Sequence, residues 1–91
     1  MARVDPVEIL AKVSEENGKQ RAFEVWRHKA TKAGWPVTVE SESVDQPGPE
    51  CGIVEIEGLR YTIRHEPRVR HRVAGEWQFT HAAWAEPITG A

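Results

Sequence analysis

The first third of the chain places its apolar residues at helical spacing. Asp5 and Pro6 are residue types that favour the start of a helix, and Gly18 is typical of a helix end. A second run of apolar residues recurs at intervals of three and four after that glycine: Ala22, Phe23, Trp26, Ala30 and Ala33. Gly34 then provides another stop. We therefore expect two helices within residues 5–33, or one long helix with a kink at Gly18.

Beyond Pro36 the period changes to two, which is typical of strands. Apolar and polar residues alternate from Val37, and a loop with two prolines and a glycine follows at residues 45–50. Four further strand-like segments are separated by turn residues: 53–57, 59–64, 68–73 and 77–81. This pattern predicts an antiparallel sheet over residues 37–81 and a loosely held tail over residues 85–91.

These elements together predict an α+β fold. We expect two N-terminal helices packed on one face of a four- to five-stranded antiparallel meander sheet. At 91 residues, the chain has room for one domain, 1–91, with one hydrophobic core. Alternation along the strands assigns eight residues to the inner face of the sheet: Val54, Ile56, Leu59, Tyr61, His71, Val73, Trp77 and Phe79.

The distribution of charge adds a distinctive surface to this fold. The formal net charge is only -2, yet residues 59–75 hold five arginines and one acid. Residues 35–58, in contrast, hold six acids and no lysine or arginine. The register that we expect rests on three turns: two residues at 57–58, three residues at 65–67 and three residues at 74–76. Alternation then places charges of both signs on the outer face of the sheet: Arg60, Arg64, Arg68, Arg70, Arg72, Glu40, Glu42 and Glu55.

This charge-split outer face has a simple interpretation and a functional one. The expected register sets Arg60 opposite Arg72 and Arg64 opposite Arg68, and each such pair costs roughly a few tenths of a kcal/mol. The simple interpretation is a solvated surface that resists aggregation. The functional interpretation is an anion-binding surface, because a partner with negative charge offsets that cost. Trp84, beyond the last expected strand, either covers the end of the core or anchors a partner.

Candidate chemistry is sparse. His71 and His81 share inner-face parity, and His28 on the second helix is within reach of a common site, but the chain lacks the Cys-x-x-Cys and His-x-x-x-His spacings of metal centres. Hydrogen-bonded core histidines are the more frequent outcome, so we expect no metal and no cofactor. Cys51 is the only cysteine, and the expected register puts it on the face away from the histidines that a nucleophile needs. We therefore expect no enzyme.

The resulting functional hypothesis is a non-catalytic protein-binding module, of the inhibitor or adaptor type found among phage and mobile-element proteins. Its expected working surface is the charge-split outer face. The alternative is a nucleic-acid-binding domain that uses the same arginine-rich hairpin, although a sequence pI near 6.1 and the inward parity of Trp77 and Phe79 weigh against it. A small metal-dependent or cysteine enzyme comes third.

The same totals bear on partners and location. We expect a protein partner first, with nucleic acid and a second copy of this chain as further candidates. No run approaches the ~18 apolar residues of a membrane span, so we expect no membrane association. A single cysteine makes no internal disulfide, which fits a reducing, cytoplasmic compartment.

Overall fold

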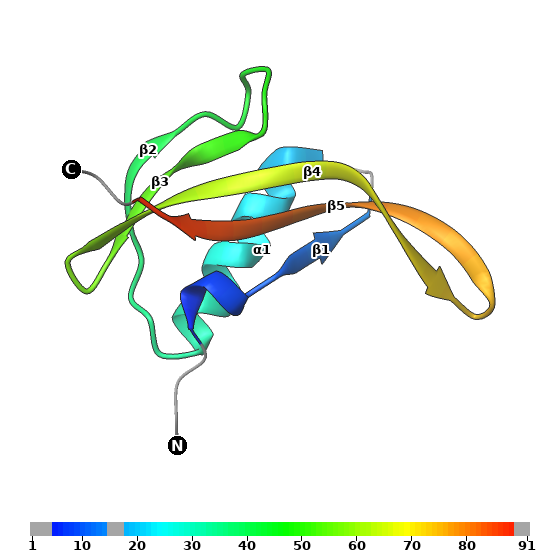
Figure 1. Cartoon of the computed structure of the whole chain (residues 1–91), viewed down its shortest axis with the longest axis horizontal. Helices are drawn as coiled ribbons and strands as arrows, with labels where there is room; N and C mark the ends of the chain where they lie inside the picture. The colour runs from blue at the N-terminus through cyan, green and yellow to red at the C-terminus, as the bar shows by residue number, and fades with distance from the viewer. Residues whose placement is uncertain (1–4, 15–17, 89–91) are drawn as a thin grey trace.

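The structure is a computed structural model that describes residues 5–14 and 18–88. One helix lies on one face of a five-stranded antiparallel sheet with strand order β1-β5-β4-β3-β2 (Figure 1). The elements are η1 (Pro6–Glu8), β1 (Ala11–Val13), α1 (Gly18–Lys32), β2 (Thr38–Glu42), β3 (Glu50–Ile56), β4 (Leu59–Val73) and β5 (Glu76–Pro87). The predicted α+β class and antiparallel sheet are confirmed, whereas the prediction of two packed helices is wrong.

The segment predicted as the first helix forms a single 3-10 turn and a strand. The Asp5 side chain accepts a hydrogen bond from the Val7 amide at 2.9 Å, so the predicted cap exists, but the helix ends after Glu8. From there burial alternates: Ile9 and Ala11 are buried, and Leu10 between them is exposed. This run fits both the helical and the strand period. Pairing with β5 decided between them, since it satisfies backbone groups along an otherwise open edge.

Helix α1 agrees with the second predicted helix. Its buried side chains are those that the spacing indicated: Ala22, Phe23, Trp26 and Ala30. At its end the Gly34 amide donates to the Thr31 carbonyl at 3.1 Å, and the Trp35 amide donates to the Ala30 carbonyl at 3.0 Å. This is a Schellman motif, with Gly34 at φ +100° in the left-handed position.

The β3–β4 hairpin also follows the prediction. Ile56 pairs with Leu59 across a two-residue turn, and Val54 pairs with Tyr61. The core between sheet and helix contains the buried residues of both: Phe23, Trp26, Val54, Ile56, Tyr61, Ile63, Ala83 and Ala85. Leu59 and Trp77 were predicted on the inner face, but they are 62% and 54% exposed. The side chains of His71, Val73 and Phe79 lie outside the described part of the structure.

Strand β4 runs without a break through the three-residue turn predicted at 65–67. Instead of a turn, a bulge lies between Glu66 and Val69, where Pro67 and Arg68 together oppose one residue of β5. Proline is tolerated at a bulge because no ladder hydrogen bond is needed from its nitrogen. The predicted pairs between Arg60 and Arg72, and between Arg64 and Arg68, are therefore wrong.

The last predicted turn is one residue shorter than expected, and the last strand is longer. Ala74 and Gly75 alone form the turn, with φ of +52° and +83°, so Val73 pairs with Glu76. Positive φ at both positions is the geometry of the type I′ turn that two-residue hairpins favour. Strand β5 continues to Pro87, which corrects the loose tail predicted from residue 85; residues 89–91 lie outside the described residues.

The far end of the β4–β5 hairpin projects beyond the rest of the sheet, and we call residues 67–80 the arm (Figure 1). The ladder between β3 and β4 ends at the pair of Glu50 with Arg64. The ladder between β1 and β5 ends at the pair of Val13 with His81. Past these pairs the described strands continue as a two-stranded ribbon, whereas the rest of the sheet, which we call the body, is covered by α1.

Candidate interaction surface on the β4–β5 arm

The bulge moves the arginines of the arm to the other face of the sheet. Residues opposite each other in an antiparallel ladder share a face. In the body Arg64 pairs with Trp84, on the face away from α1. Beyond the bulge Arg72 pairs with Trp77, whose parity on β5 is that of the inner face. The prediction that all the arginines share one outer face is therefore wrong, because two residues of β4 face one residue of β5 at the bulge.

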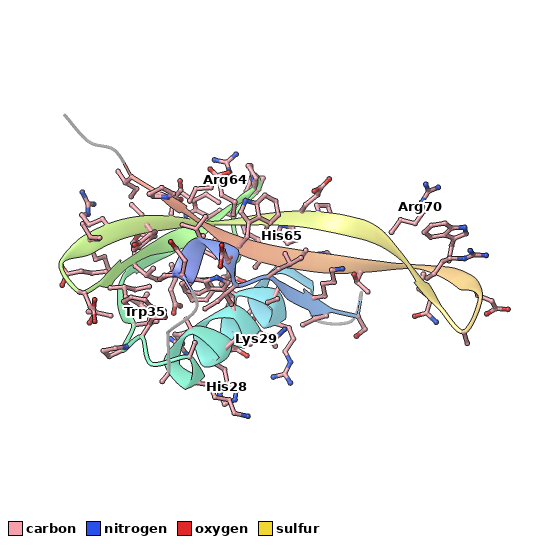
Figure 2. All side chains as sticks on the ribbon, turned by 60° about the horizontal axis from the view of Figure 1, so that its bottom comes forward. His28, Lys29, Trp35, Arg64, His65 and Arg70 are labelled. Carbon is pink, nitrogen blue, oxygen red and sulfur yellow. The ribbon has the colours of Figure 1, made fainter. Side chains whose placement is uncertain are left out.

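Trp77 contacts two guanidinium groups. The Arg70 guanidinium carbon is 4.5 Å from the Trp77 ring centroid, and that of Arg72 is 5.5 Å away. The indole is largely exposed, so each contact contributes on the order of 0.5–1 kcal/mol. Figure 2 shows Arg70 at the projecting end, far from Arg64 over the sheet. We call Arg70, Arg72 and Trp77 the Arg–Trp cluster.

The arginines of the body have carboxylate partners within the chain. Arg60 Nε lies 2.9 Å from Glu40 Oε2, and Arg64 Nε lies 3.7 Å from Glu86 Oε2. Glu42, another predicted site residue, lies 3.9 Å from the Arg27 guanidinium. The charge-split face predicted over the body is thus partly neutralised by its own side chains.

The remaining predicted site residues are scattered. Glu55 is exposed on β3, opposite Thr38 and Arg60. Trp84 lies within β5 rather than beyond the last strand, is partly buried, and donates from Nε1 to Glu86 at 3.3 Å. The side chain of Arg68 lies outside the described part of the structure. The predicted site residues are therefore not gathered into one site. Two of them, Arg70 and Arg72, instead lie together with Trp77.

Charge separates the arm from the rest of the molecule. Residues 67–80 carry three arginines and one glutamate, a formal charge of +2, which leaves −4 for the rest of a chain whose total is −2. Five strand residues reach roughly 17 Å. The Debye length at physiological ionic strength is about 8 Å, so the acidity of the body is largely screened at the tip of the arm.

A histidine pair that the sequence analysis missed lies where the arm leaves the body. His65 Nε2 and His81 Nδ1 are 2.7 Å apart, and the rings stack with centroids 4.9 Å apart. Burial lowers the pKa of His65, and the nearby His81 and Lys19 add to this effect. The predicted turn at 65–67 hid this pair, because only a continuous β4 brings His65 next to His81.

His28 and His71 are the other histidines considered for a metal site. His28 is exposed on α1, and the side chain of His71 is not described. Among the described residues, no three histidine, cysteine, aspartate or glutamate side chains are grouped to hold a metal ion. Beside His65 lies a cleft of about 480 Å³, lined by residues of α1, of the 45–50 loop and of the bulge: Lys19, Gln46, Pro47, Gly48, Pro49, His65 and Pro67. The Lys19 ammonium group in it donates to three backbone carbonyls.

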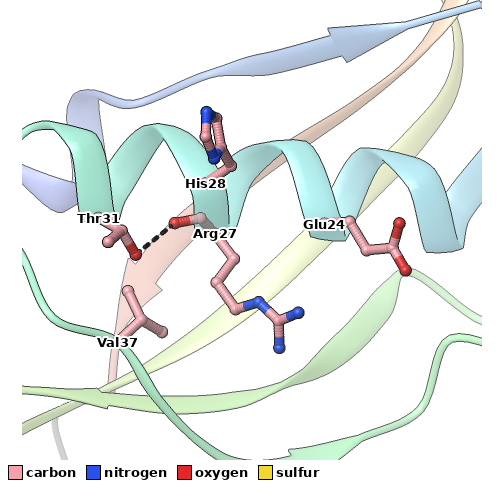
Figure 3. Close-up of a pocket in the computed structure, with 5 residues that line it drawn as sticks. All are labelled: Glu24, Arg27, His28, Thr31 and Val37. Carbon is pink, nitrogen blue, oxygen red and sulfur yellow. Dashed lines mark hydrogen bonds between the residues drawn. The ribbon is translucent and has the colours of Figure 1, made fainter.

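Cys51 lies in the core, and a groove runs along α1. Cys51 is fully buried, and burial raises the pKa of its thiol to about 11, so the thiol stays protonated at neutral pH. The groove, about 370 Å³, is lined by Glu24, Arg27, His28, Thr31 and Val37 (Figure 3). Within the groove the Thr31 hydroxyl donates to the Arg27 carbonyl at 3.0 Å.

The described helices include none that is long and apolar enough to cross a membrane. Comparison of the chain with protein-family models, with curated proteins and with solved structures finds no match.

Proposed function

We propose that this chain is a non-catalytic protein-binding module, of the inhibitor or adaptor type known from phages and mobile elements, which binds its partner through the arm. The proposal is carried by one observation: the side chain of Trp77 is 54% exposed beside Arg70 and Arg72, at the projecting end of the molecule. Tryptophan and arginine are the residue types that most often dominate the energy of protein interfaces. The predicted working surface is thereby narrowed from the whole outer face to the arm.

The charges of the arm indicate an acidic partner. Arg70 and Arg72 approach the same indole, so their charges repel each other, and a carboxylate within reach of both offsets that repulsion. Arginine also presents several donors in a planar group that matches a carboxylate. Arg60 and Arg64 contribute less, since a partner must compete with Glu40 and Glu86 for them.

Nucleic acid is the second candidate. The observed register of β4 and β5 favours it more than the register expected from the sequence, which placed Trp77 and the arginines on opposite faces. Surfaces that bind single strands combine arginines with aromatic residues, and Trp77 shares a face with Arg70 and Arg72. A two-stranded ribbon also fits the major groove of DNA. Three arginines allow only a few phosphate contacts, however, which is a weak electrostatic footprint. A small enzyme stays third, because no observation on the described residues favours it.

The single cysteine supports the proposal of a reducing, cytoplasmic compartment. The chain has no second cysteine with which Cys51 could form an internal disulfide. Complete burial of Cys51 also keeps the thiol away from other chains.

The test is capture of partners on the immobilised protein, at low and at moderate salt, with and without nuclease. The variant Arg70→Glu/Arg72→Glu reverses the charge of the cluster. The control Lys12→Glu/Lys32→Glu makes the same change in net charge at two exposed positions of the body. We expect the control to retain a nuclease-resistant protein that the arm variant loses. Equal capture by both variants would refute the proposal, and recovery of nucleic acid alone, lost as salt rises, would promote the second candidate.

A further inference from the structure

The open edges of this sheet differ in how well they are protected against pairing. An exposed strand edge invites pairing with another chain, and proteins block it with charged residues, proline, bulges or short strands. Edge strand β2 carries Glu40 and Glu42, and a bulge lies between Val39 and Ser41. Edge strand β1 has three residues and an exposed lysine. The β4 edge of the arm has the bulge and four protecting residues: Pro67, Arg68, Arg70 and Arg72.

The β5 edge of the arm lacks such protection. From Glu76 to Phe79 it carries one charged residue, which lies at the tip. Among the described strands, β1 is the only neighbour on this side, and its ladder stops at His81. In a two-residue hairpin the residues that flank the turn exchange their hydrogen bonds, so the backbone of Glu76 faces β4. By alternation the amides and carbonyls of Trp77 and Phe79 point outward from the ribbon.

We propose that two copies of this chain associate through the β5 edges of their arms, as an antiparallel pair with its two-fold axis at Gln78. In this register the outward backbone groups of Trp77 meet those of Phe79 in the second copy, which forms four hydrogen bonds. Glu76 lies across from the neutral Thr80, and Gln78 lies across from its own copy. No like charges oppose each other, and the partner strand ends where β1 begins at His81.

The distance between arginines of the two chains, and an assembly that ends at two chains, indicate that a second copy occupies this edge. Pairing through β4 instead would set arginines of two chains about 5 Å apart, which is unfavourable. Pairing through β5 gives the order β4-β5-β5-β4, with the arginines of the two copies roughly 14 Å apart, beyond the ~8 Å Debye length. The outermost strands are then both protected β4 edges. The assembly therefore closes at two copies, as expected for a two-fold interface in which the same surface meets itself.

This association has a consequence for binding that goes beyond the proposed function. A two-fold axis perpendicular to the ribbon keeps equivalent residues on the same face. The two Arg–Trp clusters then lie side by side on one four-stranded surface, which carries +4 from the two arms. A dimer thus presents two equivalent anchors to a partner, and a bivalent partner gains avidity from the second one.

The test measures the mass of the purified protein by sedimentation equilibrium over a range of concentrations. Gln78 is exposed and lies on the face opposite the Arg–Trp cluster. The variants Gln78→Lys and Gln78→Glu each put two like charges at the two-fold axis, which we expect to weaken the dimer ~10-fold or more. An equimolar mixture of the two variants pairs opposite charges, so we expect it to recover the dimer. The control Gln20→Lys makes the same change on the exposed side of α1 and should leave the dimer intact.

Two outcomes would overturn the inference. One is a wild-type chain that stays monomeric up to ~1 mM. The other is a dimer that Gln78→Lys does not weaken, which would place the interface elsewhere. A monomer that loses a captured protein when Gln78 is changed would assign this edge to a foreign strand, and it would also refute the second copy. Failure of the proposed function is distinguishable, because it appears as unchanged capture in the Arg70→Glu/Arg72→Glu variant whatever the mass of the protein.

Discussion

Strand β4 contains two halves with similar arginine content and different surroundings. In the body, between Leu59 and Arg64, the strand has neighbours on both sides, and its arginines lie beside Glu40 and Glu86. In the arm, from Val69 to Val73, β5 is its one neighbour among the described strands, and its arginines contact Trp77. The surrounding strands, rather than the arginines themselves, therefore decide whether this positive charge is paired within the fold or exposed to a partner.

The two halves also differ in what their aromatic residues contribute to stability, and a matched pair of substitutions measures this. Trp26 on α1 is fully buried, so Trp26→Ala leaves a large cavity and should lower the free energy of unfolding by about 3–5 kcal/mol. Trp77→Ala removes two exposed cation–π contacts of about 0.5–1 kcal/mol each and no core packing, so we expect a loss of about 1–2 kcal/mol. Denaturation followed by circular dichroism is the measurement, because both changes remove a fluorophore. Equal losses would contradict the distinction between body and arm.

A second pair of substitutions compares two glycines with positive φ. Gly52 in β3 has φ +148°, and a Cβ there would meet the backbone carbonyl oxygen of Ser41. Gly75 in the turn of the arm has φ +83° and open space around it. We expect Gly52→Ala to cost about 2–3 kcal/mol from strain and overpacking, and Gly75→Ala about 1–2 kcal/mol from strain alone.

Hydrogen exchange of the backbone amides locates the effect of each glycine substitution. A two-stranded ribbon can open without exposing the core, so Gly75→Ala should lower the protection of amides in the arm more than in the body. Gly52→Ala should instead lower protection throughout the sheet. Loss of protection across the whole chain in Gly75→Ala would show that arm and body unfold as one unit.

The sequence predicted those parts of the fold whose signals are local. Helix α1 and its end were predictable because the apolar spacing and Gly34 suffice to specify them. The hairpin at Glu57-Gly58 was predictable because a two-residue turn that contains a glycine keeps Val54 and Tyr61 on the same face, whereas a slip of one residue does not. Neither inference required knowledge of a distant segment.

The parts that failed depend on distant partners or on unusual turn chemistry. Residues 9–13 fit either period, and the open edge of β5 made them a strand. A proline in an apolar run usually marks a turn, and at Pro67 it marks a bulge. Ala74 adopts positive φ, which is uncommon outside glycine and asparagine, so the two-residue turn was missed. The turns predicted at 65–67 and 74–76 gave a wrong register for the arm. That register hid both the histidine pair and the position of Trp77 beside Arg70 and Arg72.

The smallest expected effect concerns the boundary between the two regions, where His65 contacts His81. Because the pKa of His65 is lowered in the folded state from its ordinary value of 6.5, the unfolded state binds more protons between the two values. The contribution of His65 to the free energy of unfolding is therefore fully present above pH 6.5, and it is lost as the pH decreases through the lowered pKa. We expect the denaturation midpoint to decrease between pH 7.5 and pH 5.5. His65→Asn should reduce the slope of the midpoint against pH.

The control for the pH dependence is His28→Asn, which changes a histidine that is exposed on α1. An equal reduction of the slope in both variants would show that the effect is not specific to the pair of His65 and His81. An unchanged slope in His65→Asn would remove the histidine pair as the source. If the slope falls and the amides of the arm lose protection at pH 5.5 before those of the body do, protonation acts first on the ribbon, because His65 and His81 lie where the arm joins the body.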